Sequence, residues 1–223
     1  MPKGLSSSFA FVELAKQYAN YCTDAPLEYT EVLAIQILGF ALGRDIIHKI
    51  QPKELYHNSY SVFLGESTLA RKDTVQSLIG IDLVPVEYHL ATSGSPEGFL
   101  EDVVDKAGVG FQFLGEWSKE LKGIKTGGYA GTFAEVKNDL SSCKPFRKRL
   151  TIKKKKKQLF VVDKPYVCLN TTITPDVLKE HVTTEIANGG YWARHVIISG
   201  EIKTRKRGRL KKVVESIRSN LKH

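Results

Sequence analysis

The chain reads SYSVFLGESTLARKDT from Ser59 to Thr74, and this stretch decides how the rest is interpreted. The apolar run Tyr60–Leu64 is typical of a buried strand, Gly65 breaks it, and a helical pattern begins near Arg71. A strand, a loop that opens on Gly and a Lys followed closely by Thr is the layout of a loop that cradles phosphate. The stretch therefore predicts an anion site.

The loop departs from the standard phosphate-loop spacing G-x-x-x-x-G-K-[ST]. That spacing would place Gly at position 70, Lys at 71 and Ser or Thr at 72, but the chain has Ala70, Arg71 and Lys72, followed by Asp73 and Thr74. Cations are unfavourable at a helix N-terminus because the helix dipole is positive there, so the adjacent Arg71 and Lys72 favour an external anion. A tight turn before an ordinary basic helix is the alternative.

Composition indicates one substantial core. The chain has 223 residues, 42% of them hydrophobic. We expect a helical extension over 1–50, a core over 51–200 and a basic tail over 201–223. No stretch reaches the roughly 18 apolar residues of a membrane span, and no signal peptide is evident, so a cytoplasmic location without membrane contact is expected. Neither a disulfide framework nor a CxxC metal site fits the widely spaced cysteines, Cys22, Cys143 and Cys168.

Helical and strand patterns alternate along the chain. Helical periodicity over Phe9–Ile47, broken near Pro26, predicts an N-terminal helical hairpin. Strands are predicted at Tyr60–Leu64, Asp82–Leu90, Val109–Leu114, Leu159–Val162, Tyr166–Leu169 and His195–Ser199. Helices are predicted at Arg71–Leu78, 95–107, Ser118–Leu121, Phe133–Leu140 and Pro175–Ile186. This order predicts an α/β fold, a mainly parallel sheet with helices on both faces.

Ligands of open α/β sheets bind at the carboxyl ends of the strands. After the first strand, Lys72 could meet phosphate oxygens and Thr74 or Asp73 could reach a magnesium ion. Glu116 follows the strand Val109–Leu114, where an acid can orient the water that attacks a phosphate. A surface Glu at a strand end is the alternative for Glu116.

Two further polar residues stand beside predicted strands. Asn170 follows Tyr166–Leu169 and could touch a terminal phosphate or the attacking water, although helix capping before Pro175 explains it equally well. Arg194 could act on phosphate charge within the chain or across an interface, as arginine fingers do, or could be an ordinary solvated residue. The histidines show no zinc-binding spacing.

The net charge of +9 is concentrated in the C-terminal half, in Lys144–Lys157 and Lys203–Lys212. Such runs attract polyanions because binding releases counterions, so DNA is the expected partner; a solubilising basic loop is the alternative. The candidate nucleic-acid contacts are Lys153, Lys154, Lys155, Lys156, Lys157, Arg205, Lys206 and Arg207.

The order of these motifs resembles the RecA-like P-loop ATPase domain of uncharacterised primase- and helicase-associated proteins of phages, plasmids and archaeal mobile elements. The resemblance spans about Phe9–Ser199 and rests on LAIQILGFALGRDI, SVFLGESTLARKDT, SGSPEGFLEDV, FQFLGEW, CLNTTITPDVL and GGYWARHVII. It implies ATP and Mg²⁺ as cofactors and a homo-oligomer with nucleotide between subunits. The implied nucleotide contacts are Gly65, Glu66, Ser67, Thr68, Arg71, Lys72, Asp73 and Thr74.

The same resemblance implies that Glu116 polarises water, Asn170 is a sensor and Arg194 is the finger. In this family an Asp-Glu pair is expected where the chain has Gly115-Glu116. We therefore expect an ATP-binding, weakly hydrolysing ATPase that acts on DNA in the replication or maintenance of a mobile element. The alternatives are a catalytically decayed scaffold that binds nucleic acid, and a loader that docks a helicase or primase through Phe9–Ile47.

Overall fold

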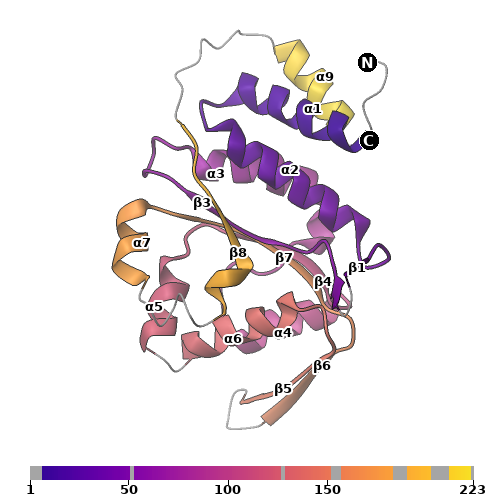
Figure 1. The fold of residues 1–223 in the computed structure, drawn as a ribbon, viewed down its shortest axis with the longest axis vertical. Helices are drawn as coiled ribbons and strands as arrows, with labels where there is room; N and C mark the ends of the chain where they lie inside the picture. The colour runs from indigo at the N-terminus through magenta and orange to yellow at the C-terminus, as the bar shows by residue number, and fades with distance from the viewer. Residues whose placement is uncertain are drawn as a thin grey trace.

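A four-stranded parallel sheet forms the centre of the computed structural model, which describes residues 7–50, 53–126, 129–151, 157–182, 190–201 and 211–221. Its strand order is β4-β7-β3-β8 (Figure 1). The strands are β3 (Tyr60–Leu64), β4 (Val109–Leu114), β7 (Tyr166–Ile173) and β8 (His195–Ile198). The fold is thus α/β with parallel strands, as the alternating pattern predicts.

The two middle strands, β3 and β7, are buried on both faces. In β3, Phe63 belongs to the apolar cluster on one side of the sheet and its neighbour Val62 to a cluster on the other. All eight residues of β7 are buried. Strands of this kind read as continuous apolar or β-branched runs because helices cover both faces of a parallel sheet.

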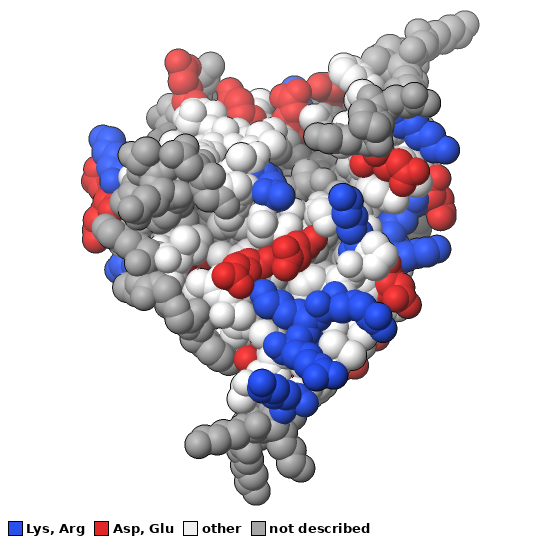
Figure 2. All heavy atoms as spheres, turned by 60° about the horizontal axis from the view of Figure 1, so that its bottom comes forward, with Lys and Arg blue, Asp and Glu red and all other residues white. Residues whose placement is uncertain are grey.

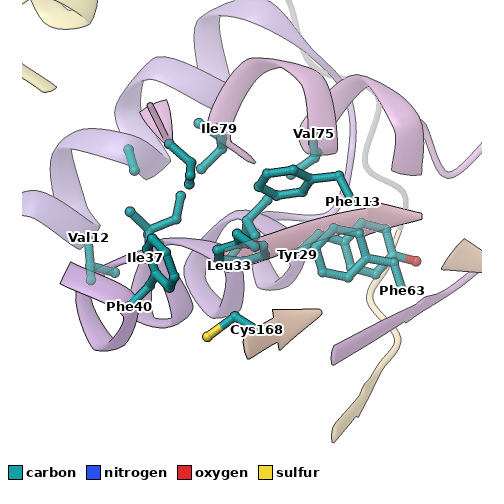
Figure 3. Packing of buried hydrophobic residues seen from close by; sticks show 14 of the residues in the cluster. Val12, Tyr29, Leu33, Ile37, Phe40, Phe63, Val75, Ile79, Phe113 and Cys168 are labelled. Carbon is teal, nitrogen blue, oxygen red and sulfur yellow. The ribbon is translucent and has the colours of Figure 1, made fainter. Parts of the chain in front are cut away.

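The first face is covered by α1 (Ser7–Cys22), α2 (Leu27–Leu42), and α3 (Lys72–Val75) continued by the π-helix η1 (Gln76–Ile81). Figure 3 shows Tyr29 of α2 lying against Phe63, whose ring centroid is 4.6 Å away in a stacked arrangement. The C-terminal helix α9 (Lys211–Leu221) lies beside α1 (Figure 1). The N-terminal helical hairpin therefore shares one apolar cluster with the sheet.

The opposite face carries α4 (Pro96–Asp105), α5 (Ser118–Thr126) and α6 (Tyr129–Ser141), with α7 (Pro175–His181) beside α5 (Figure 1). Lys137 of α6 and Glu120 of α5 form a buried ion pair there, and the hydroxyl of Tyr191 donates to the same carboxylate. Burial without compensation would be costly for either charge, so the pair fixes α5 against α6.

Two hairpins and two 3-10 turns complete the described chain. Two antiparallel hairpins are formed by β1 (His48–Ile50) with β2 (Lys53–Leu55), and by β5 (Phe146–Thr151) with β6 (Lys157–Val162). The second hairpin projects from the bottom of Figure 1. The 3-10 turns are η2 (Val86–Tyr88) and η4 (Trp192–Arg194). No described helix is both long and apolar enough to cross a membrane.

The predicted strand Asp82–Leu90 is wrong. The helix that starts at Lys72 continues through Leu83, η2 follows, and only His89 makes a single parallel bridge, to Phe111 of β4. Pro85 has no N–H to donate to a strand ladder, which explains why the alternating pattern does not become a strand. The strand β5 was not predicted, because FRKRLT is dominated by charge.

Candidate functional site

A cavity of about 490 Å³ opens at the carboxyl ends of β3, β4 and β7. The register of the sheet brings these ends together: Leu64 pairs with Ile173, and Leu114 with Thr171. The cavity is lined by Glu66, Ser67, Thr68, Arg71, Lys72, Asp73, Thr74, Gly115, Glu116, Thr172, Ile173 and Thr174. Most of the residues predicted to hold phosphate and metal therefore share one cavity with Glu116.

Gly65 makes the tight start of the loop possible. Its N–H donates to the carbonyl of Ile173 on β7 at 3.2 Å. A Cβ at this position would lie 2.5 Å from both the Cβ of Ala70 and the hydroxyl oxygen of Tyr29. That hydroxyl in turn donates to the carbonyl of Leu64 at 2.6 Å, so α2 closes the back of the loop.

The loop is one residue longer than the standard spacing. Helix α3 begins at Lys72, and Arg71 directly before it has φ 50° and ψ 32°, the left-handed conformation. The carbonyl of Arg71 accepts from the N–H groups of Thr74 and Val75 at 3.1 and 3.2 Å. In the standard pattern a Gly precedes the Lys, so Arg71, and not Ala70, occupies the position of that Gly.

The ammonium group of Lys72 is folded back onto the loop. Lys72 is 8% exposed, and its Nζ donates to the carbonyls of Gly65 and, at 3.4 Å, Glu66. Burial lowers the pKa of Lys72, and the carboxylates of Asp73, Glu66 and Glu116 act in the opposite direction. The cation is thus held inside the cavity wall by neutral carbonyl oxygens, which a phosphate could replace.

Carboxylates outnumber cations around the cavity. The lining contains two cations, Arg71 and Lys72, and the three acids Glu66, Asp73 and Glu116. A bare polyphosphate would meet net repulsion, whereas a complex with a divalent cation would be compatible with this balance.

Residues able to hold magnesium are present but do not form a closed metal site. Among the described residues, no three His, Cys, Asp or Glu side chains converge on a point where they could bind a metal ion. Mg²⁺ in nucleotide sites needs only one or two protein oxygens, because phosphates and water supply the others. Thr74 and Asp73, the two residues predicted to hold magnesium, line the cavity and carry oxygens of this kind.

The structure does not bring Asn170 to the cavity. The strand predicted to end at Leu169 continues to Ile173, which places Asn170 inside β7 with no exposed surface. Its Nδ2 donates to Ser61 Oγ at 2.8 Å, and its Oδ1 accepts from Gln76 Nε2 at 2.8 Å. The β-branched residues after Asn170 favour strand, and this preference prevails over the expected helix-capping turn.

Thr172 and Thr174 reach the cavity in its place. The hydroxyl of Thr172 donates to the carbonyl of Gly115, and the carbonyl of Thr172 accepts from the N–H of Trp117 at 3.0 Å. These bonds tie the end of β7 to the loop that carries Glu116. The run Thr171–Thr174 directly before Pro175 was the sequence signal, and helix capping was the alternative considered for this segment.

Arg194 lies at the other end of the sheet. It ends η4 just before β8, and His195 pairs with Tyr60, the first residue of β3. Five residues of strand separate that end from the loop, about 15 Å at the usual rise. The Nη1 of Arg194 donates to the carbonyl of Gly190 at 2.5 Å. Within one chain, Arg194 and the cavity are therefore on opposite edges.

Of the predicted nucleic-acid contacts, the described residues include Lys157. Lys157 is exposed at the start of β6. The other residues, Lys153, Lys154, Lys155, Lys156, Arg205, Lys206 and Arg207, lie outside the described residues.

No protein-family model matches the chain, and no curated protein matches its sequence. A similar solved structure is the A form apo structure of the C-terminal region of NrS-1, with 11% sequence identity and a TM-score of 0.46. The match covers 96% of this chain and 43% of that chain. The chain thus spans less than half the length of that structure.

The substitution Gly65→Ala should lower the free energy of unfolding by about 1–3 kcal/mol, because the added Cβ cannot be accommodated between Ala70 and Tyr29. Gly115→Ala is the matched control on the same cavity, since its Cβ would have no neighbour within 4 Å. Urea unfolding of both variants measures the difference. Equal stability of the two would show that the loop does not need glycine at position 65.

Proposed function

We propose that the cavity binds a nucleoside triphosphate with Mg²⁺, most simply ATP, and hydrolyses it slowly. The observation that carries this proposal is the meeting of Lys72 and Glu116 in one cavity at the carboxyl ends of parallel strands. A phosphate-binding cation and a water-orienting acid are two of the elements that phosphoryl transfer needs, since its catalysis depends on positioning and charge neutralisation.

In this proposal the loop Gly65–Thr68 surrounds the phosphates, and Lys72 leaves the carbonyls of Gly65 and Glu66 to bind them. Thr74 and Asp73 hold the magnesium ion, directly or through water. Glu116 orients the attacking water. The lining's excess of carboxylates supports the metal complex, and not the free nucleotide, as the ligand.

A RecA-like relation remains part of the proposal. Strand β7 lies between β3, which leads into the loop, and β4, which leads to Glu116. The ends of both β4 and β7 border the cavity. Thr172 and Thr174 then take the place that the sequence had suggested for Asn170 beside the terminal phosphate.

Nucleic acid is the partner that we propose for the β5–β6 hairpin. Arg147 and Arg149 alternate with the buried Phe146 and Leu150, so both arginines point away from the core. Lys157 is exposed on the paired strand, opposite Thr151. Figure 2 shows lysines and arginines gathered on the face that contains the bottom of Figure 1. A surface of this kind attracts a phosphate backbone whatever its sequence.

In this proposal the nucleotide cavity and the β5–β6 hairpin act together on DNA, during the replication or maintenance of a mobile element. A decayed scaffold that binds DNA without nucleotide is the second candidate, favoured by Gly115 at the position of the expected Asp. A loader that docks a helicase or primase through α1 and α2 is supported less, because both helices contribute to the cluster that covers the sheet.

Lys72→Ala should weaken Mg-ATP binding by roughly tenfold to a hundredfold, the value of a hydrogen bond between charged groups. Isothermal titration calorimetry on the full chain measures the dissociation constant. Lys179→Ala, an exposed lysine on α7, is the control and should bind like the unchanged chain. Equal binding by the Lys72 and Lys179 variants would refute the nucleotide site.

Glu116→Gln should leave the dissociation constant for Mg-ATP within about threefold and slow turnover by about a hundredfold or more, the usual effect of losing a positioned acid–base group. Phosphate release under saturating Mg-ATP measures this, with and without single-stranded DNA. Unaltered turnover would exclude Glu116 from the reaction. Binding by the unchanged chain without any turnover would favour the scaffold.

The double substitution Arg147→Gln and Arg149→Gln should weaken single-stranded DNA binding and reduce the slope of log affinity against log salt by about 1.4, since each neutralised phosphate contributes about 0.7. Fluorescence anisotropy across a salt series measures both quantities. Lys49→Gln with Lys179→Gln removes the same charge from two exposed sites elsewhere. Equal losses in the two double variants would show that only net charge matters.

A further inference from the structure

We propose that the guanidinium group of Arg71 binds the terminal phosphate. One chain then supplies the arginine of its own site, whereas Arg194 could reach the cavity only from a second copy. This inference rests on the proposed function and specifies how its site recognises a triphosphate. Arg71 lines the cavity and directly precedes Lys72.

The side chain of Arg71 is exposed. Among the residues that the structure describes, no hydrogen bond or ion pair involves its guanidinium group. At this position the backbone of Arg71 contributes to the fold, because its carbonyl accepts from the N–H groups of Thr74 and Val75. A glycine could provide that carbonyl equally well.

Glycine would in fact be the easier residue here. At φ 50° a side chain crowds the backbone, and glycine avoids this conflict. The chain keeps an arginine in a conformation that disfavours it, at the rim of a cavity with more acids than bases. Ala107 and Cys143 have a similar φ away from the cavity, so the left-handed conformation alone does not indicate a function. Its combination with an exposed guanidinium at the cavity does.

The two neighbouring cations reach different parts of the cavity. Lys72 is buried and turned back toward Gly65 and Glu66 at the start of the loop. Arg71 is exposed, on the outer part. The phosphate enclosed by the loop therefore meets Lys72, and the phosphate beyond it meets Arg71. Guanidinium suits this role because it is always charged and can bind two phosphate oxygens at once.

Arg194 does not compete for this position within the chain. It stands at the amino ends of the strands, with its Nη1 bound to Gly190. Only a neighbouring copy could bring it to the cavity. If Arg71 binds the terminal phosphate, the site distinguishes triphosphate from diphosphate without a neighbour.

The test compares Arg71→Gly with Lys72→Ala in binding a non-hydrolysable ATP analogue and ADP, both with Mg²⁺. Arg71→Gly should raise the midpoint of thermal unfolding, because strain is relieved. It should also lower the affinity for the analogue at least tenfold and that for ADP less than threefold. Ala107→Gly is the control: this exposed residue also has a left-handed φ, 53°, outside the cavity, so it should gain stability with unchanged binding.

Three results would overturn the inference while leaving the nucleotide site intact, provided that Lys72→Ala still loses binding. They are unchanged analogue binding by Arg71→Gly, an equal loss for analogue and ADP, and a selective loss of analogue binding in Arg194→Gln but not in Arg71→Gly. Unchanged binding by Lys72→Ala would instead reject the proposed function itself. Arg71→Ala, which keeps the unfavourable φ and loses the charge, should lose analogue binding without gaining stability.

Discussion

Five consecutive residue pairs join β3 to β7 in parallel, from Tyr60 with Leu169 to Leu64 with Ile173. The last pair continues into the loop, where the N–H of Gly65 donates to Ile173. A parallel register aligns the carboxyl ends of its strands, so the loop after β3 and the threonines at the end of β7 must face the same cavity. The pairing of β7 with β4 adds the segment that carries Glu116.

A network of buried side-chain hydrogen bonds fixes this arrangement and extends from α2 to the helix after the loop. Gln36 Nε2 donates to the carbonyls of Ser59 and Leu169, and Ser61 Oγ donates to Gln36 Oε1. The hydrogen bonds continue beyond Ser61, because Asn170 Nδ2 donates to Ser61 Oγ and Gln76 Nε2 donates to Asn170 Oδ1. Each buried group left without its partner would cost about 1–3 kcal/mol, which makes the network sensitive to register. Asn170 therefore orders the sheet beneath the cavity from inside β7.

Much of this arrangement could be predicted from local pattern. The strand Tyr60–Leu64 and the strand Val109–Leu114 have the predicted bounds, and the loop residues around Lys72 do line a cavity with Glu116. The cavity could be predicted from the strand bounds, because the position of a ligand at a strand end depends on where that strand stops. The sequence alone shows that the lysine lies one position later than in the standard motif, and the left-handed φ of Arg71 shows that Arg71 takes the place of the expected Gly.

The failures have separate physical causes. Asn170 was misplaced because Thr and Ile can either continue a strand or introduce a helix, and the choice depends on pairing with β3 and β4. Arg194 was treated as a strand-end residue although it precedes its strand, which in a parallel sheet means the opposite edge. The hairpin strand β5 was hidden because only Phe146 and Leu150 in it are buried.

The most direct measurement for the central claim is a crystal structure of the full chain with Mg²⁺ and a non-hydrolysable ATP analogue. The account predicts the phosphates inside the cavity, with Lys72 Nζ moved from the carbonyl of Gly65 to a phosphate oxygen and Glu116 facing the terminal phosphate. An analogue bound elsewhere, or an empty cavity at saturating analogue with Lys72 still on Gly65, would contradict it.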